Sequence, residues 1–265
     1  MDPSYKTLRV LLVIVKLLLN KRVRVVFEFG SRYGEDTVVF ASSFPFATVF
    51  GFECNPNTLA ILKQNVKPYN NIKITEAAVG DKIGKVKFYP INAEKTITTW
   101  EDGNQGASSL FKASGKYEIE TYIQDEIEVD MLTLEYVMDQ NKIESVDVLW
   151  MDIQGAEMLA LKGLGRRIKD VRIIHTEVEF IEIYENQPLF KDVHEFLLKN
   201  DFIFYKFSHK GGASGDAIFI NKTVFPNSLI YLRFIMAMWI YTKTTNMLFR
   251  AKKVIKGGLK MLGLW

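Results

Sequence analysis

The chain has 265 residues, of which 48% are hydrophobic and 25% charged, and its formal net charge is +3. This length can hold one large α/β domain with an appendage or two small domains, and the apolar content excludes wholesale disorder. Cys54 is the single cysteine. It excludes a disulfide framework and an all-thiolate metal site, and a reducing, cytoplasmic location fits it best.

Basic charge is concentrated at the C-terminal end of the chain. Residues 222–265 carry eight basic side chains and no acidic one, which leaves 26 of the 34 basic and all 31 acidic side chains to residues 1–221. The main body is therefore mildly acidic, and we expect no nucleic-acid partner. The composition predicts an N-terminal helix over 1–22, a main domain over 23–221 and a basic, apolar C-terminal extension over 222–265.

Two apolar stretches, Leu8–Leu19 and Leu229–Tyr241, are too short to cross a bilayer of about 30 Å, and both contain cations. The first lacks a small-residue cleavage site and leads into a strand, so we interpret it as a structural helix. The last part of the extension, 247–265, mixes large apolar residues with five cations, which is typical of a segment on anionic lipid. Two alternatives stay open: peripheral contact with the inner membrane surface through 229–265, or packing on the body or on a second subunit.

Strands and helices are expected to alternate along the main domain. The predicted strands cover 23–29, 47–52, 72–77, 85–90, 118–123, 146–151, 171–178, 202–207 and 216–220. The predicted helices cover 35–43, 56–66, 129–141, 156–164 and 190–200. This alternation predicts an α/β fold with a mostly parallel sheet covered on both faces. The last two strands are joined by a glycine-containing loop, 209–215, and are expected to be antiparallel.

Acidic residues stand at the ends of three predicted strands: Glu28, Glu53 and Asp152. In an open α/β sheet, ligands bind beyond the carboxyl ends of the strands. Gly30 lets the backbone approach a ligand closely, and Gly34 follows four residues later. The third glycine of the dinucleotide fingerprint is absent, so a nicotinamide oxidoreductase is the least expected function.

Glu53 lies 23 residues after Gly30, near the spacing at which a second-strand acid accepts hydrogen bonds from ribose hydroxyls. Glu28 is placed to meet an ammonium group or to fix the turn. An acid for a cation, a glycine turn and an acid for a ribose favour S-adenosyl-L-methionine (AdoMet) over NAD as the cofactor.

The chain resembles the FkbM family of methyltransferases over about residues 23–221. The segments that carry the resemblance are VFEFGSRYGEDT (26–37), VFGFECNP (49–56), EAAVGD (76–81), ASSL (107–110), VDVLWMDIQGAEMLALKG (146–163), TEVEFIEIYENQPLF (176–190) and FLLKNDFIFY (196–205). The resemblance implies a Rossmann-like class I methyltransferase fold with a terminal antiparallel strand.

The resemblance also implies roles for single residues. Glu28, Gly30 and Gly34 would surround the methionine end of AdoMet, and Glu53 would bind its ribose. The adenine would lie against Ala78 and Val79. The expected cofactor-binding set is completed by Ser31, Tyr33, Cys54 and Asn55.

Asp152 would face the transferred methyl group. A carboxylate at a strand end can accept the proton of a hydroxyl as its oxygen attacks. Glu157 is interpreted instead as a first-turn acid at a helix N-terminus.

Two positions depart from the family pattern: Glu28 stands where the family usually has Asp, and Gln154 stands where it usually has an acid. The second departure leaves metal binding and base strength open.

His175 and Glu177 alternate with apolar residues, so a strand would point both to one face. His175 is a further candidate base, with a packed histidine as the alternative. Asp152 and Glu177 together could bind magnesium or manganese, although their spacing does not establish a metal site. The polar loop Thr98–Gly115 is expected either to close over AdoMet or shape the acceptor pocket, or to be a disordered surface loop.

The resemblance implies methylation of a hydroxyl, on a sugar of a glycan or glycolipid or on a macrolide. Two alternatives remain: a non-catalytic, membrane-associated scaffold that keeps the fold, and an N-methyltransferase of a small amine or peptide. The sequence NPPY, typical of many N-methyltransferases, is missing where MDIQGAE stands. The sequence predicts neither the acceptor's identity nor the oligomeric state.

Overall fold

The computed structural model describes residues 3–19, 23–225, 227, 230–238 and 243. The chain divides into two compact units, Met1–Val224 and Phe225–Trp265. The first unit contains every helix and strand described below.

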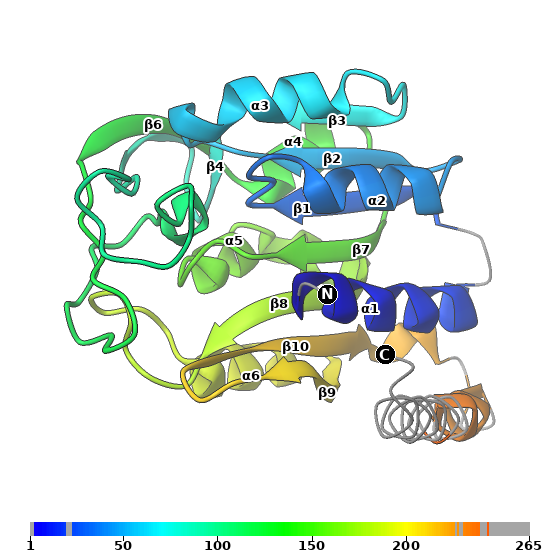
Figure 1. Cartoon of the computed structure of the whole chain (residues 1–265). Coiled ribbons are helices and arrows are strands. Elements are labelled where there is room, and N and C mark those ends of the chain that lie inside the picture. The colour runs from blue at the N-terminus through cyan, green and yellow to red at the C-terminus, as the bar shows by residue number, and fades with distance from the viewer. Residues whose placement is uncertain (1–2, 20–22, 226, 228–229, 239–242, 244–265) are drawn as a thin grey trace, which may run out of the picture. The chain divides into compact units, whose positions relative to one another are not determined.

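A seven-stranded sheet organises the first unit (Figure 1). Its strand order is β3-β2-β1-β7-β8-β10-β9. All neighbouring pairs are parallel except those of β10, which runs antiparallel to both β8 and β9. The predicted parallel sheet with a terminal antiparallel pair is confirmed. The strands are β1 (Val25–Phe29), β2 (Thr48–Phe52), β3 (Ile72–Thr75), β7 (Val146–Met151), β8 (Val171–Glu179), β9 (Phe202–Lys210) and β10 (Ser214–Asn221).

Helices cover both faces of this sheet. In Figure 1, α1 and α2 lie on the near face and α4, α5 and α6 on the far face, while α3 packs beside α2. The helices are α1 (Pro3–Leu19), α2 (Glu35–Ser43), α3 (Pro56–Val66), α4 (Leu134–Gln140), α5 (Glu157–Lys162) and α6 (Phe190–Lys199). Short 3-10 turns cover Gln105–Ala107, Gly165–Asp170 and Lys222–Val224.

The central strands are apolar because both of their faces are covered. All six residues of β7 are buried. On one face, Phe27 of β1 meets Phe50 and Phe52 of β2 at ring-centroid distances of 5.2 and 5.7 Å, in edge-to-face geometry. On the other face, Phe40 of α2 packs on Trp150 at 5.6 Å. Aromatic packing therefore joins β1 to β2 on one face and α2 to β7 on the other.

The amphipathic α1 buries Leu8, Leu11, Ile14 and Val15, as expected of a structural helix. Among the described residues, no helix is both long enough and apolar enough to span a membrane. Most of the predicted C-terminal extension, including all of 247–265, lies outside the described residues.

A small second sheet of order β4-β6-β5 corrects two predictions. The region predicted as a strand, 118–123, has only an isolated bridge from Thr121 to Ile97. The strand is β6 (Ile127–Leu132), which pairs with β4 (Ala78–Val79) and β5 (Gly84–Phe88) and includes the start of the helix predicted over 129–141. Residues 127–131 alternate apolar and acidic side chains, a period of two. The helix begins later because the Thr133 side chain caps α4 by accepting from the Tyr136 N–H.

The loop predicted over 209–215 is also shorter than expected. β9 continues to Lys210 and β10 begins at Ser214, so His209 lies in a strand opposite Asp216. A register shift between Asp216 and Ala217 lets the two strands stay paired through the glycine-containing segment.

A buried carboxylate joins the start of the central strands. Asp147 of β7 is 2% exposed. Its Oδ2 accepts the backbone N–H groups of Arg24 at 2.6 Å and Val25 at 3.1 Å, and its Oδ1 accepts from Arg172 Nη1 at 3.0 Å. One side chain thereby connects β1, β7 and β8.

Asp147→Ala is expected to lower the free energy of unfolding by about 3 kcal/mol, because two backbone N–H groups and an arginine lose their acceptor. Urea unfolding measures this loss. Asp130→Ala is the matched control: Asp130 pairs with Lys85 at 2.9 Å on the surface, and its removal should cost less than about 1 kcal/mol. Equal losses for the two variants would contradict the role given to Asp147.

Candidate active site

The carboxyl ends of β1 and β7 meet where the strand order reverses. In the sheet, β2 and β3 follow on one side of β1, and β8 follows on the opposite side, next to β7. Gly30 adopts φ +80, and a β-carbon there would lie 2.0 Å from the carbonyl oxygen of Asp152. The Asp152 N–H donates to the Phe29 carbonyl at 3.1 Å. Only glycine lets these two chain segments come this close, and the crevice beside them is where such sheets bind ligands.

A pocket opens from this point and encloses about 670 Å³ of empty space, part of it open to solvent. Its lining comes from six parts of the chain: 29–32, 52–58, 77–79, Phe88, 105–110 and 152–156. The predicted site residues among them are Gly30, Glu53, Cys54, Asn55, Ala78, Val79 and Asp152. The structure therefore brings together, in one cavity, residues from β1, β2, β4 and β7 that the sequence analysis singled out separately.

Glu53 is the most constrained of these residues. Its Oε2 accepts the Arg32 N–H and its Oε1 accepts the Asn55 N–H, both at 2.7 Å. Burial raises the pKa of Glu53 to about 7, although these hydrogen bonds act to lower it. Each carboxylate oxygen keeps a further lone pair, so the group can still accept hydrogen bonds from a ligand in the pocket. Burial also raises the pKa of the neighbouring Cys54 thiol.

The far end of the pocket is apolar. Ala78 and Val79 of β4 lie there with Phe88 of β5 and Leu110 of the long loop. Such a slot between aliphatic and aromatic side chains suits a flat, weakly polar ring system.

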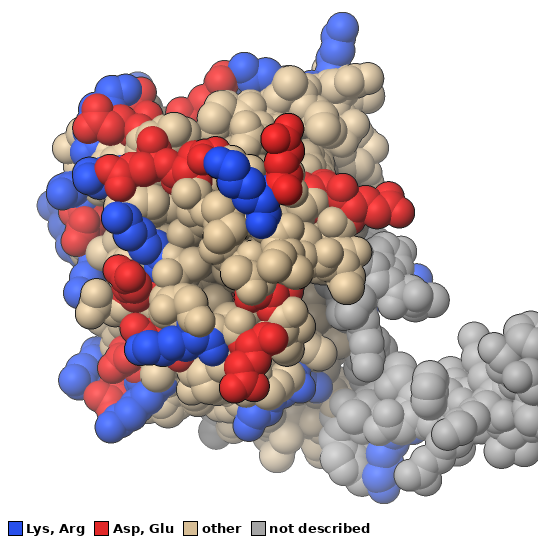
Figure 2. All heavy atoms as spheres, turned by 60° about the vertical axis from the view of Figure 1, so that its left-hand side comes forward, with Lys and Arg blue, Asp and Glu red and all other residues tan. Residues whose placement is uncertain are grey.

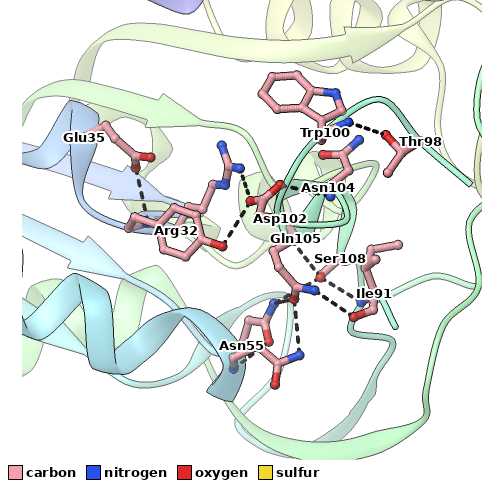
Figure 3. A network of polar contacts seen from close by, with 12 residues as sticks. Arg32, Glu35, Asn55, Ile91, Thr98, Trp100, Asp102, Asn104, Gln105 and Ser108 are labelled. Carbon is pink, nitrogen blue, oxygen red and sulfur yellow. Dashed lines mark hydrogen bonds and ion pairs between the residues drawn. The ribbon is translucent and has the colours of Figure 1, made fainter. Parts of the chain in front are cut away.

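The predicted loop Thr98–Gly115 supplies one wall of the pocket. Figure 3 shows its contacts with the strand ends. Asn55 Nδ2 donates to Gln105 Oε1 at 3.3 Å and to Ser108 Oγ at 3.1 Å, and Gln105 Nε2 donates to the Ile91 carbonyl at 3.0 Å. Gln105, Ser108 and Leu110 line the cavity. The loop thus lies over the cavity, as the first of the two sequence-based alternatives proposed.

A second set of contacts holds the same loop at Asp102. Arg32 forms an ion pair with Asp102 (Figure 3). The Tyr33 hydroxyl donates to Asp102 Oδ2 at 3.0 Å. These contacts hold the pKa of Asp102 below its usual value against the effect of its burial. Tyr33 lies outside the pocket lining, so its observed role is to hold the loop.

Three other predicted cofactor residues, Glu28, Ser31 and Gly34, do not line the pocket. Glu28 is buried, and desolvation followed by repulsion from Asp36 raises its pKa well above the usual value. Within the described part of the chain, Glu28 Oε2 and Ser31 Oγ have no hydrogen-bond partner. Gly34 adopts φ +87, and a β-carbon there would lie 2.9 Å from Leu62 Cδ1, so it serves the packing of α3.

Asp152 stands at the opposite end of the pocket, exposed at the end of β7. Gln154 Nε2 donates to Asp152 Oδ1 at 2.8 Å and to Glu177 Oε2 at 2.5 Å. Desolvation, and then repulsion from Asp152, raises the pKa of Glu177 well above its usual value. The structure therefore places two of the three predicted catalytic residues side by side.

The third predicted catalytic residue, His175, packs in the core. This corrects the prediction that it acts as a base. It is 1% exposed and stacks on Trp150 at 3.9 Å with parallel rings. Its Nε2 lies 2.8 Å from Ser208 Oγ. Desolvation lowers the pKa of His175 to about 3, so the ring stays neutral and a poor proton acceptor at neutral pH.

Glu157 is likewise held by the fold. Its Oε1 accepts the Ile153 N–H at 3.0 Å at the start of α5, and burial raises its pKa to about 7. This is the helix-terminus role expected for it.

In the part of the chain that the structure describes, no group of three or more His, Cys, Asp or Glu side chains is arranged to hold a metal ion. Asp152 and Glu177 are both present, but the Gln154 amide occupies the oxygens that face each other.

The family model described as "Methyltransferase FkbM domain" matches residues 28–204. The chain belongs to the FkbM methyltransferase family. It is thus an AdoMet-dependent methyltransferase, and the resemblance and the fold class inferred from its sequence are confirmed.

Three known proteins are similar to parts of this chain. The 2-O-methyltransferase NoeI of Sinorhizobium fredii is 28% identical over 64% of this chain and 69% of its own length. Methyltransferase 1 of Beauveria bassiana is 24% identical over 52% of this chain and 57% of its own. The crystal structure of methyltransferase FkbM from Methylobacillus flagellatus is 14% identical over 75% of this chain, with a TM-score of 0.49, and the matched part is 43% of that chain.

The pocket of this FkbM-family protein fits AdoMet in the chemistry of its walls. It has an apolar slot, a carboxylate with free lone pairs and an exposed carboxylate at the strand ends. The buried Glu28 Oε2 has no hydrogen-bond partner among the described residues. Sequence reasoning did not single out Phe88, and it named Gln105, Ser108 and Leu110 only as parts of the loop Thr98–Gly115. Gln154 was noticed as a departure from the family pattern but given no contact, because its partners lie on other strands.

The pKa of Glu53 predicts a pH dependence of nucleoside binding. A carboxylate with a pKa near 7 is about one-eleventh ionised at pH 6 and about ten-elevenths ionised at pH 8, and the ionised form is the better acceptor for ribose hydroxyls. Affinity should therefore rise about tenfold from pH 6 to pH 8. Calorimetry with 5′-methylthioadenosine isolates this effect, because that ligand lacks the titrating amino-acid part of AdoMet. A Glu53→Gln variant should bind weakly at both values, and a flat profile in the unmodified protein would contradict the assignment.

Proposed function

We propose that this chain transfers the methyl group of AdoMet to a hydroxyl oxygen, and that the acceptor is a sugar of a glycan or glycolipid. The observation that carries the proposal is that Asp152 lines the same pocket as Gly30 and Glu53. A candidate base and the candidate cofactor residues thereby share one cavity. The relation to a protein named 2-O-methyltransferase supports oxygen as the accepting atom.

In the proposed arrangement, Glu53 binds the ribose hydroxyls, and Ala78 and Val79 lie against the adenine. Gly30 leaves room for the methionine part at the end of β1. AdoMet supplies an electrophilic methyl group there when bound. Asp152 would orient the acceptor hydroxyl and accept its proton as the oxygen takes up the methyl group.

A sugar suits the surroundings of Asp152. Carboxylates accept hydrogen bonds from sugar hydroxyls, and Asp152 and Glu177 offer several lone pairs. The ring centroids of Tyr117 and Tyr122 are 5.8 Å apart. Burial raises the pKa of both hydroxyls, and the charge of the nearby Glu177 raises them further. Figure 2 shows acidic and basic side chains interspersed on this side of the molecule, and no continuous basic surface on that face that would suit a phosphate backbone.

Asp152→Asn should lower kcat for methyl transfer by about 100-fold or more, because an amide cannot accept the proton. AdoMet affinity should change much less. Transfer of labelled methyl groups to sugar acceptors measures the first quantity and calorimetry the second. Glu195→Gln is the control, because it also replaces a carboxylate by an amide, at an exposed position on α6.

Full activity of Asp152→Asn would exclude the base assignment. Comparison of glycan masses from cells with and without the gene tests the acceptor class, since a lost methyl group identifies it. AdoMet binding without transfer to any acceptor would favour the scaffold alternative.

We also propose peripheral contact with anionic lipid through the second unit. Among its described residues, Ile230, Tyr231, Leu232 and Met236 are exposed, at 37–53%. Residues 222–265 carry eight cations and no acid. Exposed apolar side chains beside basic ones suit the headgroup region of an anionic membrane.

The full chain should therefore bind vesicles of phosphatidylcholine with phosphatidylglycerol and not phosphatidylcholine alone. Binding should weaken toward about 1 M salt, where the Debye length falls to about 3 Å. Changing Leu232 and Met236 to Ser should weaken binding in flotation assays. The control Leu198→Ser removes an equally exposed apolar side chain from α6, and an equal loss there, or no binding to either vesicle, would contradict the proposal.

A further inference from the structure

Gln154 occupies a position that its local sequence does not explain. It follows β7 in the turn to α5, where it adopts φ +55, and Gly155 follows at φ +92. Non-glycine residues adopt such a φ infrequently, and they tend to do so at functional sites. The strained turn aims the side chain across the end of β7 toward β8.

Both ends of the Gln154 amide are engaged. Its nitrogen donates to Asp152 at 2.8 Å and to Glu177 at 2.5 Å, so each N–H of the amide serves a different carboxylate. Its Oε1 lies 2.8 Å from the hydroxyl of Tyr184, which is fully buried. The amide is therefore fixed in orientation as well as in place.

Two neighbouring carboxylates repel each other, and proteins usually relieve this by a shared proton or a bound cation. Here a neutral group with two donors lies between them. A divalent ion placed between the same two oxygens would have to displace the amide, which presents hydrogen atoms and no lone pair to them. The donor set between the two acids is therefore unsuited to a cation.

Gln154 also connects the two ends of the pocket. The backbone carbonyl of Gln154 accepts from Ser109 Oγ at 2.6 Å. Tyr184 Oη lies 2.8 Å from the Ala107 backbone carbonyl and also 2.8 Å from Gln154 Oε1. Residues 105–110 form the wall of the cofactor pocket. The orientation of the acids is thus set by the same contacts that hold this wall.

We propose that Gln154 is a positioning residue that takes the place of a cation between Asp152 and Glu177, so that methyl transfer needs no divalent metal. The amide holds Asp152 Oδ1 and leaves Oδ2 to meet the acceptor hydroxyl. This inference rests on the proposed role of Asp152 as the base. Gln154 itself lies outside the pocket lining and acts through its neighbours.

Gln154→Glu is the decisive variant, because it keeps the shape and replaces the donor by a third carboxylate. Without metal, its kcat should fall at least tenfold, and AdoMet affinity should stay within about threefold. Millimolar Mn²⁺ should restore part of kcat, since three carboxylates now form an oxygen-rich site. In the unmodified protein, neither EDTA nor Mn²⁺ should change kcat. Gln154→Met, which has no donor and no charge, should lose kcat without rescue by Mn²⁺.

A binding measurement separates this inference from the proposed function. Titration of Mn²⁺ by calorimetry should show binding to Gln154→Glu and none to the unmodified protein, whatever the acceptor is. Gln140→Glu, an added carboxylate on an exposed position of α4, should bind no Mn²⁺. Thermal unfolding of each variant identifies loss of fold.

Two results would overturn the inference. One is loss of activity of the unmodified protein on chelation with recovery on adding Mg²⁺ or Mn²⁺. The other is a Gln154→Glu variant with full kcat in the absence of metal. Failure to methylate any sugar, with the Mn²⁺ result as expected, would instead contradict the proposed acceptor and leave the placement of Gln154 standing.

Discussion

The close approach of Gly30 to the Asp152 carbonyl is the constraint on which the rest of the site depends. It occurs where β1 and β7 end side by side at the reversal of strand order. The sheet fixes both backbones through its hydrogen bonds, so the acid at the end of β7 cannot drift away from the turn at the end of β1. The cofactor pocket and the candidate base are therefore placed by the same backbone contact, and the long loop supplies one further wall.

Several acidic side chains around the site are buried. Glu28, Glu53, Glu157 and Glu177 are all desolvated, and burial raises the pKa of each. A carboxylate whose pKa is raised in the folded state destabilises the fold as pH rises from the unfolded pKa through the folded one. Backbone N–H donors offset part of this cost at Glu53 and Glu157. At Glu177 the donor is the side chain of Gln154, which makes that contact dependent on a single residue.

The loop Thr98–Gly115 contacts both the cofactor end and the catalytic end of the pocket. Asn55 holds it through Gln105 and Ser108, and Tyr184 lies against both Ala107 and Gln154. A polar loop of this length would be expected to move freely if it were solvated. Here its polar groups are paired with strand ends, so it serves as a wall of the pocket.

The sequence by itself determined the order of strands and helices in the main domain, the acids at three strand ends and the family. These are local properties, because apolar runs, glycine turns and helix caps each depend only on residues that are close together in the sequence. It did not determine where β6 lies, because the segments 118–123 and 127–132 both have strand character and only pairing with β5 distinguishes them. Nor did it reveal that His175 stacks on Trp150 or that Gln154 lies between two acids. Those contacts join residues from different strands, and only the register of the folded sheet decides which side chains meet.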